Sequence, residues 1–259
     1  MSSSSTIIYI GGPTVILEIG GLRLMTDPTL DPAGVVFPIN GKPGYSKLMG
    51  PAAADTGEID IVLLSHDQHG DNLDNAGRAL LPAVGQVLTT PAGAQRLGGN
   101  ARGLAPWESV DVTAPDGKVI TITGTPARHG PAGSEKITGD VTGFIVRVKS
   151  DPGLELYFTG DTVFYEGVEE VARRFQPQNV FVFAGAAKPR GPFNVTMGAN
   201  DVLDTAGAFP KATITPLHFE GWSHFTENAE TLKVSFAALG IADRLKVIPP
   251  GEAVSLPLA

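Results

Sequence analysis

Two histidines and three aspartates lie within the ten-residue stretch SHDQHGDNLD, at positions 65–74. The stretch follows IDIVLL (59–64), an apolar run with the length and composition of a buried strand. Imidazole and carboxylate are the ligands that zinc and similar metal ions prefer in proteins. The residue types therefore predict one wall of a metal site, placed where a strand ends.

The other histidines show the same relation to predicted strands. The chain has five histidines, and four of them come directly after an apolar strand pattern. His129 follows VITITGTPA, His218 ends ITPLH, and Asp161 follows LYFTG in the same way. Strand ends in a sheet protein tend to lie along one edge, so we expect these side chains to converge. A metal ion held there would lower the pKa of its bound water to about 7, which makes hydroxide available at neutral pH.

Each of these residues also has a simpler interpretation when it is taken alone. A histidine at a strand end is often only a surface or hydrogen-bonding residue. Asp71 or Asp74 could cap the following helix, and Asp161 in TGDT could form an Asx turn. The joint pattern of strand-end histidines and clustered aspartates favours a shared site over these separate explanations.

Composition limits the class of protein. The chain has 259 residues, 42% hydrophobic and 18% charged, with a formal net charge of −8, and an acidic surface disfavours nucleic-acid binding. The absence of cysteine excludes disulfides, iron–sulfur clusters, thiolate nucleophiles and zinc fingers. The start MSSSSTIIYIGG has no secretory-signal pattern, and no apolar run reaches the roughly 18 residues of a membrane span. We therefore expect a cytoplasmic protein with a small-molecule substrate, and a homo-oligomer is compatible with the sequence.

Hydrophobic patterns and turn residues give the order of elements. Residues 29–58 are rich in Pro, Gly and Ala and predict a long loop that could act as a lid. Asp71 or Asn72 is an expected N-cap of the helix that follows the stretch 65–74. Helices are expected over 73–83, 91–98, 168–175, 199–209 and 227–240. Strands are expected over 6–12, 14–21, 22–28, 59–65, 86–90, 118–130, 143–149, 154–162, 179–186 and 212–219, with one or two more over 244–256.

This order predicts an α+β fold of two β-sheets packed face to face with helices outside, in one domain over residues 1–259. The order of SHDQHGDNLD, PARHG, YFTGDT and TPLHF resembles the metallo-β-lactamase superfamily. Its usual first motif is His-x-His-x-Asp-His, followed by a lone His, a metal-bridging Asp and a final His. The segments LMTDPTL and TMGANDVLD look most like the branch that contains the ascorbate-6-phosphate lactonases and the N-acyl-phosphatidylethanolamine phospholipases. The resemblance covers nearly the whole chain and implies a four-layer αββα sandwich with mixed sheets.

The resemblance also implies a ligand set, although the first motif departs from the family pattern. The motif is one residue too long, so Gln68 matches the second His from the left and His69 matches it from the right. We favour His69, because it keeps the two-residue step to Asp71. The implied first metal site is His66, His69, His129 and the bridging Asp161, and the implied second site is Asp71, Asp161 and His218.

Asn72 stands where the motif has its last His. A neutral amide is a poorer ligand than imidazole, so we expect one or two ions per chain and a weaker second site. The oxygen-rich second site favours Mn²⁺ or weakly bound Zn²⁺. Candidates for substrate contact are Trp222, His224, Arg128 and Lys188. The alternative is core packing for Trp222, a surface position for His224, and solvation for the two basic residues.

The sequence therefore predicts a metal-dependent hydrolase, which uses metal-bound hydroxide on a small ester, lactone or phosphodiester substrate. Asp71 and Asp161 are the expected catalytic carboxylates. Two alternatives remain open at this point. One is an iron-dependent redox enzyme of the same fold, and the other is a non-catalytic metal-binding or regulatory descendant.

Overall fold

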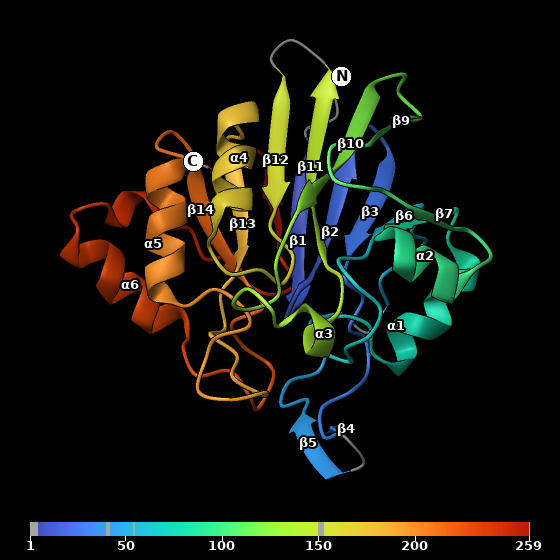
Figure 1. Ribbon diagram of the computed structural model, residues 1–259. Helices are drawn as coiled ribbons and strands as arrows, with labels where there is room; N and C mark the ends of the chain where they lie inside the picture. The colour runs from blue at the N-terminus through green and yellow to red at the C-terminus, as the bar shows by residue number, and fades with distance from the viewer. Residues whose placement is uncertain (1–4, 40–41, 54, 150–152, 259) are drawn as a thin grey trace.

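The computed structural model describes residues 5–39, 42–53, 55–149 and 153–258, and its centre is a pair of mixed β-sheets packed face to face (Figure 1). One sheet has seven strands in the order β15-β1-β2-β3-β6-β7-β8. The pairing from β15 to β3 is antiparallel, and the pairing from β3 to β8 is parallel. In chain order, its strands are β1 (Thr6–Gly11), β2 (Thr14–Ile19), β3 (Leu22–Thr26), β6 (Ile61–Leu63), β7 (Gln86–Thr89), β8 (Ala101–Gly103) and β15 (Ala253–Ser255).

The other sheet has six strands in the order β14-β13-β12-β11-β10-β9. Its strands are β9 (Ser109–Thr113), β10 (Val119–Pro126), β11 (Thr142–Lys149), β12 (Leu154–Phe158), β13 (Asn179–Phe183) and β14 (Thr213–Leu217). Pairing is antiparallel from β9 to β12 and parallel from β12 to β14. Strands β10, β12 and β14 therefore run in the same direction and end at the same edge of the sheet. His129, Asp161 and His218 follow those three ends in the sequence.

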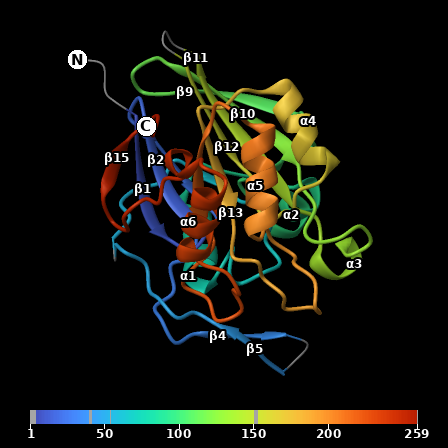
Figure 2. The same cartoon turned by 90° about the vertical axis from the view of Figure 1, so that its left-hand side faces the viewer.

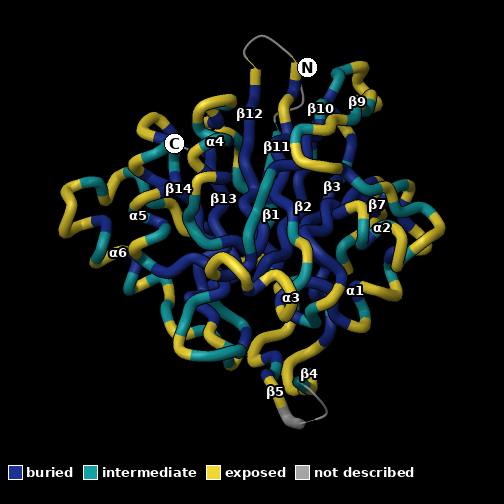
Figure 3. Tube along the Cα trace, viewed as in Figure 1, coloured by how far each residue is buried: buried dark blue, intermediate teal, exposed yellow. Residues whose placement is uncertain are grey.

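The central strands are apolar on both faces, because each sheet is covered on both sides. In β13, Phe181 and Phe183 lie in the core between the sheets, whereas Val180 and Val182 lie in a second core under the helices. Figure 3 shows buried strands at the centre of the molecule and exposed residues on the surrounding helices and loops. Burial of both faces explains why these strands are nearly continuous apolar runs in the sequence.

Helices cover the outer face of each sheet, as the two views in Figures 1 and 2 show. Helices α4 (Glu166–Arg174), α5 (Ala199–Ala208) and α6 (Ala229–Ala238) pack on the six-stranded sheet through Val171, Val202 and Phe236. Helices α1 (Asn75–Leu80) and α2 (Pro91–Leu97) cover the seven-stranded sheet, and the short α3 (Glu135–Thr138), η1 (Leu81–Ala83) and η2 (Ala242–Arg244) complete the helical elements. The predicted αββα sandwich is confirmed.

Some local predictions were wrong. The expected loop 29–58 contains β4 (Val36–Ile39) and β5 (Lys42–Ser46), which pair as a separate two-stranded sheet, and residues 40, 41 and 54 lie outside the described residues. Helix α1 is capped by Asp74, not by Asp71 or Asn72, since the Asp74 carboxylate accepts the Gly77 N–H at 2.9 Å. The short elements β8, β9 and α3 were not expected: β8 and α3 are only three and four residues long, and β9 has no buried residue, although its sequence SVDVT alternates between polar and apolar residues.

The prediction about membranes rests on the helices. Within the described residues, no helix combines the length and the apolar character that a membrane crossing requires. Residues 1–4, at the start that was read for a secretory signal, lie outside the described residues. The cytoplasmic location and the homo-oligomer stay predictions.

Candidate metal centre

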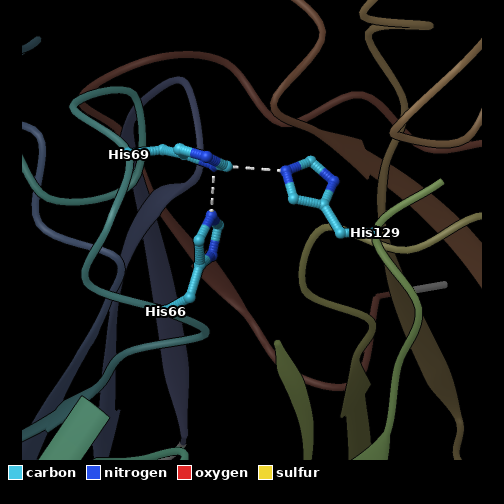
Figure 4. Close-up of side chains that lie close together, drawn as sticks. All are labelled: His66, His69 and His129. Carbon is cyan, nitrogen blue, oxygen red and sulfur yellow. Dashed lines mark hydrogen bonds between the residues drawn. The ribbon is translucent and has the colours of Figure 1, made fainter. Parts of the chain in front are cut away.

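Three imidazoles converge at the edge where the strands end, and we call His66, His69 and His129 the histidine cluster (Figure 4). His66 and His69 lie in the loop between β6 and α1, and His129 lies just after β10. The Nδ1 atom of His69 is 2.8 Å from Nε2 of His66 and 3.2 Å from Nε2 of His129. One ring nitrogen of each histidine thus points to a common centre, as three imidazole ligands of one cation do.

Hydrogen bonds behind the rings orient two of these imidazoles. The Nδ1–H of His129 donates to the backbone oxygen of Val195 at 2.7 Å. Because a carbonyl oxygen can only accept, Nδ1 carries the proton and Nε2 presents a lone pair to the cluster. The Nδ1 atom of His66 is 2.9 Å from the Ser65 hydroxyl. Metal-binding histidines are commonly oriented by such outer partners.

His66 and His69 carry little charge at neutral pH. Burial lowers the pKa of His66 well below its usual value, and the neighbouring His69 adds to this effect. Burial and the nearby His129 lower the pKa of His69 to about 4. Both imidazoles are therefore neutral near pH 7, and a cation would not have to displace protons from them.

Two carboxylates and a fourth imidazole form a second group, and we call Asp71, Asp161 and His218 the carboxylate cluster. Asp71 shares the loop of His69, Asp161 follows β12, and His218 follows β14. The Nε2 atom of His218 is 3.4 Å from Oδ2 of Asp71 and 3.4 Å from Oδ1 of Asp161. The other oxygen of Asp161, Oδ2, is 3.6 Å from Nε2 of His129. Asp161 thus contacts both clusters, with one oxygen each.

Mutual attraction keeps the carboxylate cluster ionised in spite of burial. Burial disfavours the charged imidazolium, but Asp161 and Asp71 outweigh it and raise the pKa of His218 to about 10. Burial likewise opposes ionisation of Asp71, but His224 and His218 hold its pKa well below the usual range. The pKa of Asp161 is lowered against burial by His218 and His129. Without a cation, this cluster is an ion pair around a protonated His218.

The geometry of both clusters fits a divalent cation. A tetrahedral zinc site with ligand bonds of about 2.0–2.1 Å places its ligand atoms about 3.3 Å apart. The separations of 3.2 Å from His129 to His69 and 3.4 Å from His218 to Asp161 match that spacing. In addition, Oδ1 of Asp161 and both ring nitrogens of His218 are buried without a hydrogen-bond partner among the described residues. Buried polar atoms are rarely left unpartnered, and a cation would complete this set.

Gly160 allows the two sheets to meet at the site. Its φ is +63°, and a Cβ there would lie 2.4 Å from the Thr142 oxygen and 3.1 Å from Cβ of Ser65. The Thr142 N–H donates to the Ser65 oxygen at 3.0 Å, which joins the loop after β6 to the edge of the other sheet. His218 also has a left-handed backbone, with a φ of +53°. Such conformations in non-glycine residues cluster at functional sites.

Three other residues of the stretch 65–74 lie outside both clusters. Asp67 pairs with Arg96, with Oδ1 2.5 Å from Nη2. Gln68 is exposed and lies against Gly139, so His69 is the one of the two alternatives that reaches the site. Asn72 is fully buried, and its Nδ2 lies 3.5 Å from the Ser65 hydroxyl. The stretch therefore divides its polar residues between the site and its support.

His224 lies at the site, and Trp222 lies behind it. The Nε2 atom of His224 is 2.9 Å from Oδ2 of Asp71, and its ring lines the cavity over the two clusters. Trp222 is buried and packs against the rings of Phe37 and Tyr45, so its packing resembles that of a core residue. Substrate contact by either residue stays a prediction.

The two cations predicted to contact substrate lie away from this cavity. Arg128 stacks over the Tyr165 ring at 4.3 Å and pairs with Glu166 at 3.6 Å. Lys188 is exposed and is not among the described residues that line the cavity, whereas Arg190 is. The segment GAAKPRG (185–191) contains both Lys188 and Arg190, and nothing in its sequence indicates which of the two lines the cavity.

Tyr45 is a site residue that the sequence reasoning missed. It comes from β5, lines the cavity, and its ring centroid is 4.5 Å from that of His224. Its hydroxyl oxygen accepts the Gly70 N–H at 3.0 Å. Burial and the charge of Asp71 raise the pKa of Tyr45, so the phenol keeps its proton at neutral pH. Its position within an irregular proline- and glycine-rich segment gave no signal.

The comparison with known families agrees with this arrangement of strands and ligands. The sequence model of one protein family, the β-lactamase superfamily domain, matches residues 23–219 of this chain. The chain belongs to this superfamily. The UPF0173 protein YddR of Bacillus subtilis is 26% identical over 257 residues, which cover 95% of this chain and 98% of YddR. A UPF0173 metal-dependent hydrolase of Caldivirga maquilingensis is 21% identical over 256 residues, which cover 96% of this chain and 97% of that protein.

A solved structure extends the agreement to the whole fold. The isothiocyanate hydrolase from Delia radicum gut bacteria superposes with a TM-score of 0.82 at 24% identity, over 97% of this chain and 99% of that one. The predicted superfamily is confirmed by the family model, and the prediction of a metal-dependent hydrolase agrees with the name of the Caldivirga relative. The metal, the substrate and the role of each residue stay predictions.

Proposed function

We propose that the histidine and carboxylate clusters each hold one divalent cation, Zn²⁺ or Mn²⁺, and that the protein uses them to hydrolyse a small ester, lactone or phosphodiester. One observation supports this most strongly. The two oxygens of Asp161 lie 3.6 Å from Nε2 of His129 and 3.4 Å from Nε2 of His218. A carboxylate in this position serves two adjacent ligand sets at once, as a bridging ligand in a two-metal site does.

The residues around the two sites have distinct roles. A bound divalent cation would lower the pKa of a coordinated water and polarise the bond to be cleaved. Asp71 is held by His224 at 2.9 Å, so its carboxylate is fixed where it can orient an attacking water. Tyr45 already accepts a hydrogen bond from Gly70, so its own O–H can be donated to Asp71 or to a substrate oxygen.

The cavity over the clusters limits the substrate. Among the described residues, its lining combines apolar side chains with one basic side chain, that of Arg190. The apolar residues are Ile39, Ala187, Pro189 and Val195. A compact substrate with an apolar part and a negatively charged or strongly polar group matches this lining.

The test is a hydrolase screen on chelator-treated protein reloaded with Zn²⁺ or Mn²⁺, under anaerobic conditions and without thiols. The panel contains lactones, phosphodiesters and simple esters, and it includes an isothiocyanate because one structural neighbour hydrolyses that class. Turnover that returns with metal and needs neither oxygen nor thiol supports the proposal. Turnover only with iron and oxygen would instead identify a redox enzyme. A protein that binds no metal and turns over nothing would be a non-catalytic descendant.

A further inference from the structure

The carboxylate cluster lacks the imidazole that the family motif places after its aspartate. Asn72 stands at that position, fully buried, and its Nδ2 lies 3.5 Å from the Ser65 hydroxyl. The Ser65 hydroxyl is in turn 2.9 Å from Nδ1 of His66. Asn72 therefore supports the back of the histidine cluster, and the carboxylate cluster keeps only His218 as a nitrogen donor from the expected set.

His224 brings a second imidazole to the same place from a different part of the chain. Its Nε2 is 2.9 Å from Oδ2 of Asp71, the same oxygen that lies 3.4 Å from Nε2 of His218. Two ring nitrogens from the segment after β14 thus face one carboxylate oxygen. The Nδ1 atom of His224 is buried and has no hydrogen-bond partner among the described residues, as is also true of His218.

The position of His224 is fixed by the segment that carries it. The backbone N–H of Ser223 donates to the Ser46 oxygen at 3.0 Å, and the N–H of Ser46 donates to the Ser223 hydroxyl at 2.9 Å. The Phe225 ring packs against both imidazoles, with centroids 4.8 Å from His218 and 4.6 Å from His224. The imidazole is therefore placed at the cluster before any cation binds, which is what a ligand requires.

We propose that His224 is the second nitrogen ligand of the cation held by Asp71, Asp161 and His218, in place of the imidazole absent at Asn72. The assignment rests on the two-cation site proposed above. It changes the expectation for that site, because His224 would raise the number of protein ligands from three to four and supply a second imidazole. The carboxylate site would then be a strong site despite Asn72.

The test measures metal content and Co²⁺ absorption in three variants, without any activity assay. His224→Ala removes the imidazole. His224→Gln is the matched control, because its amide keeps an N–H donor for Asp71 but lacks the imidazole nitrogen. The double variant Asn72→His/His224→Ala moves the imidazole to the motif position. Thermal unfolding of each metal-free variant checks that the protein still folds.

The unmodified protein is expected to bind two ions, and His224→Ala and His224→Gln one each. Their affinity for the second ion should fall by more than the roughly 10–100-fold that loss of an outer partner costs. The double variant should regain the second ion and the Co²⁺ spectrum of a four-ligand site.

Two tightly held ions in His224→Gln would show that His224 only positions Asp71, and would overturn the assignment alone. A double variant that stays at one ion would contradict the equivalence of positions 72 and 224. An unmodified protein without bound metal would overturn the proposed function itself.

Discussion

The histidine cluster and the carboxylate cluster lie side by side, but burial and neighbouring groups shift the pKa of their imidazoles in opposite directions. Within the histidine cluster, His66 and His69 avoid charge, since burial and neighbouring imidazoles lower their pKa. The carboxylate cluster keeps charge, since Asp161 and Asp71 overcome burial and raise the pKa of His218 to about 10. One site thus offers neutral imidazoles at His66 and His69 to a cation, and the other offers two carboxylates that are paired with one imidazolium.

This difference predicts which step limits metal binding at each site. A cation entering the histidine cluster meets neutral imidazoles at His66 and His69, which have no proton to lose. A cation entering the carboxylate cluster must expel the proton of His218, but it gains two negative charges in return. The histidine cluster should therefore be less sensitive to pH, and the carboxylate cluster more so.

Replacing Asp161, whose carboxylate contacts both clusters, should have the largest effect on turnover and metal content. Asp161→Asn replaces the carboxylate whose oxygens contact His129 and His218, so both sites lose a charged ligand. Hydrolysis should fall by more than the about 10²–10³-fold that loss of a single stabilising donor costs. The measurement is turnover at saturating metal together with metal content after dialysis.

Asp67→Asn is the matched control for that variant. Asp67 lies in the same stretch of sequence as Asp71, but it pairs with Arg96 and lies outside both clusters. Its substitution should leave metal content and turnover close to those of the unmodified protein. Equal losses in the two variants would mean that Asp161 has no special role as a bridge.

The histidine cluster should depend strongly on His129. His129→Ala removes one of three convergent nitrogens, and its backbone partner Val195 loses the Nδ1–H. The affinity of this site should fall by more than the roughly 10–100-fold seen for outer partners. Calorimetric titration with Zn²⁺ checks this. An unchanged number of tightly held ions would rule out His129 as a ligand.

The sequence alone located the clusters because their ligands follow strands that have clear apolar patterns. His129, Asp161 and His218 come directly after β10, β12 and β14, and those strands share a direction. The two-sheet sandwich followed from the same apolar runs. The strand pattern predicted that these side chains converge at one edge, whereas the choice of His69 and the division into two ligand sets came from the resemblance to the superfamily motif.

The remaining parts of the site depend on contacts that no local pattern carries. Tyr45 reaches the cavity through a small hairpin, β4–β5, inside a segment rich in Pro and Gly. His224 comes near Asp71 through tertiary contacts of its segment, among them the pairing of Ser223 with Ser46, 177 residues earlier in the chain. Tertiary contacts of this kind fix a side chain without leaving a period or a cap in the sequence.

The contrast between the clusters predicts a pH dependence of metal binding. His218 has a pKa of about 10 in the folded protein against 6.5 for an ordinary histidine. Its ion pair therefore stabilises the metal-free fold fully below pH 6.5, and this stabilisation is lost as pH rises through 10. Over the same window, the affinity of the carboxylate cluster for a cation should rise about tenfold per pH unit, because binding releases one proton.

Calorimetry near pH 7 in two buffers of different ionisation enthalpy measures the protons released. We expect about one proton for the ion in the carboxylate cluster and fewer for the ion in the histidine cluster. Equal proton release from both sites would remove the electrostatic difference between them. Loss of the difference in His218→Gln would assign the released proton to His218.

The smallest effect on chemistry should come from the residue that joins the sheets behind both clusters. Gly160→Ala adds a Cβ 2.4 Å from the Thr142 oxygen, at a φ of +63°. The strained backbone should cost roughly 1–3 kcal/mol of unfolding free energy. Asp161 should shift with it, so that turnover falls less than in Asp161→Asn. Chemical denaturation and metal titration measure the two consequences separately.

Gly207→Ala in α5 is the control, because a Cβ there meets open space and should stabilise the helix by about 0.4–1 kcal/mol. If Gly160→Ala were as stable as that control, close packing at Gly160 would not be what holds the bridging carboxylate between the two sites.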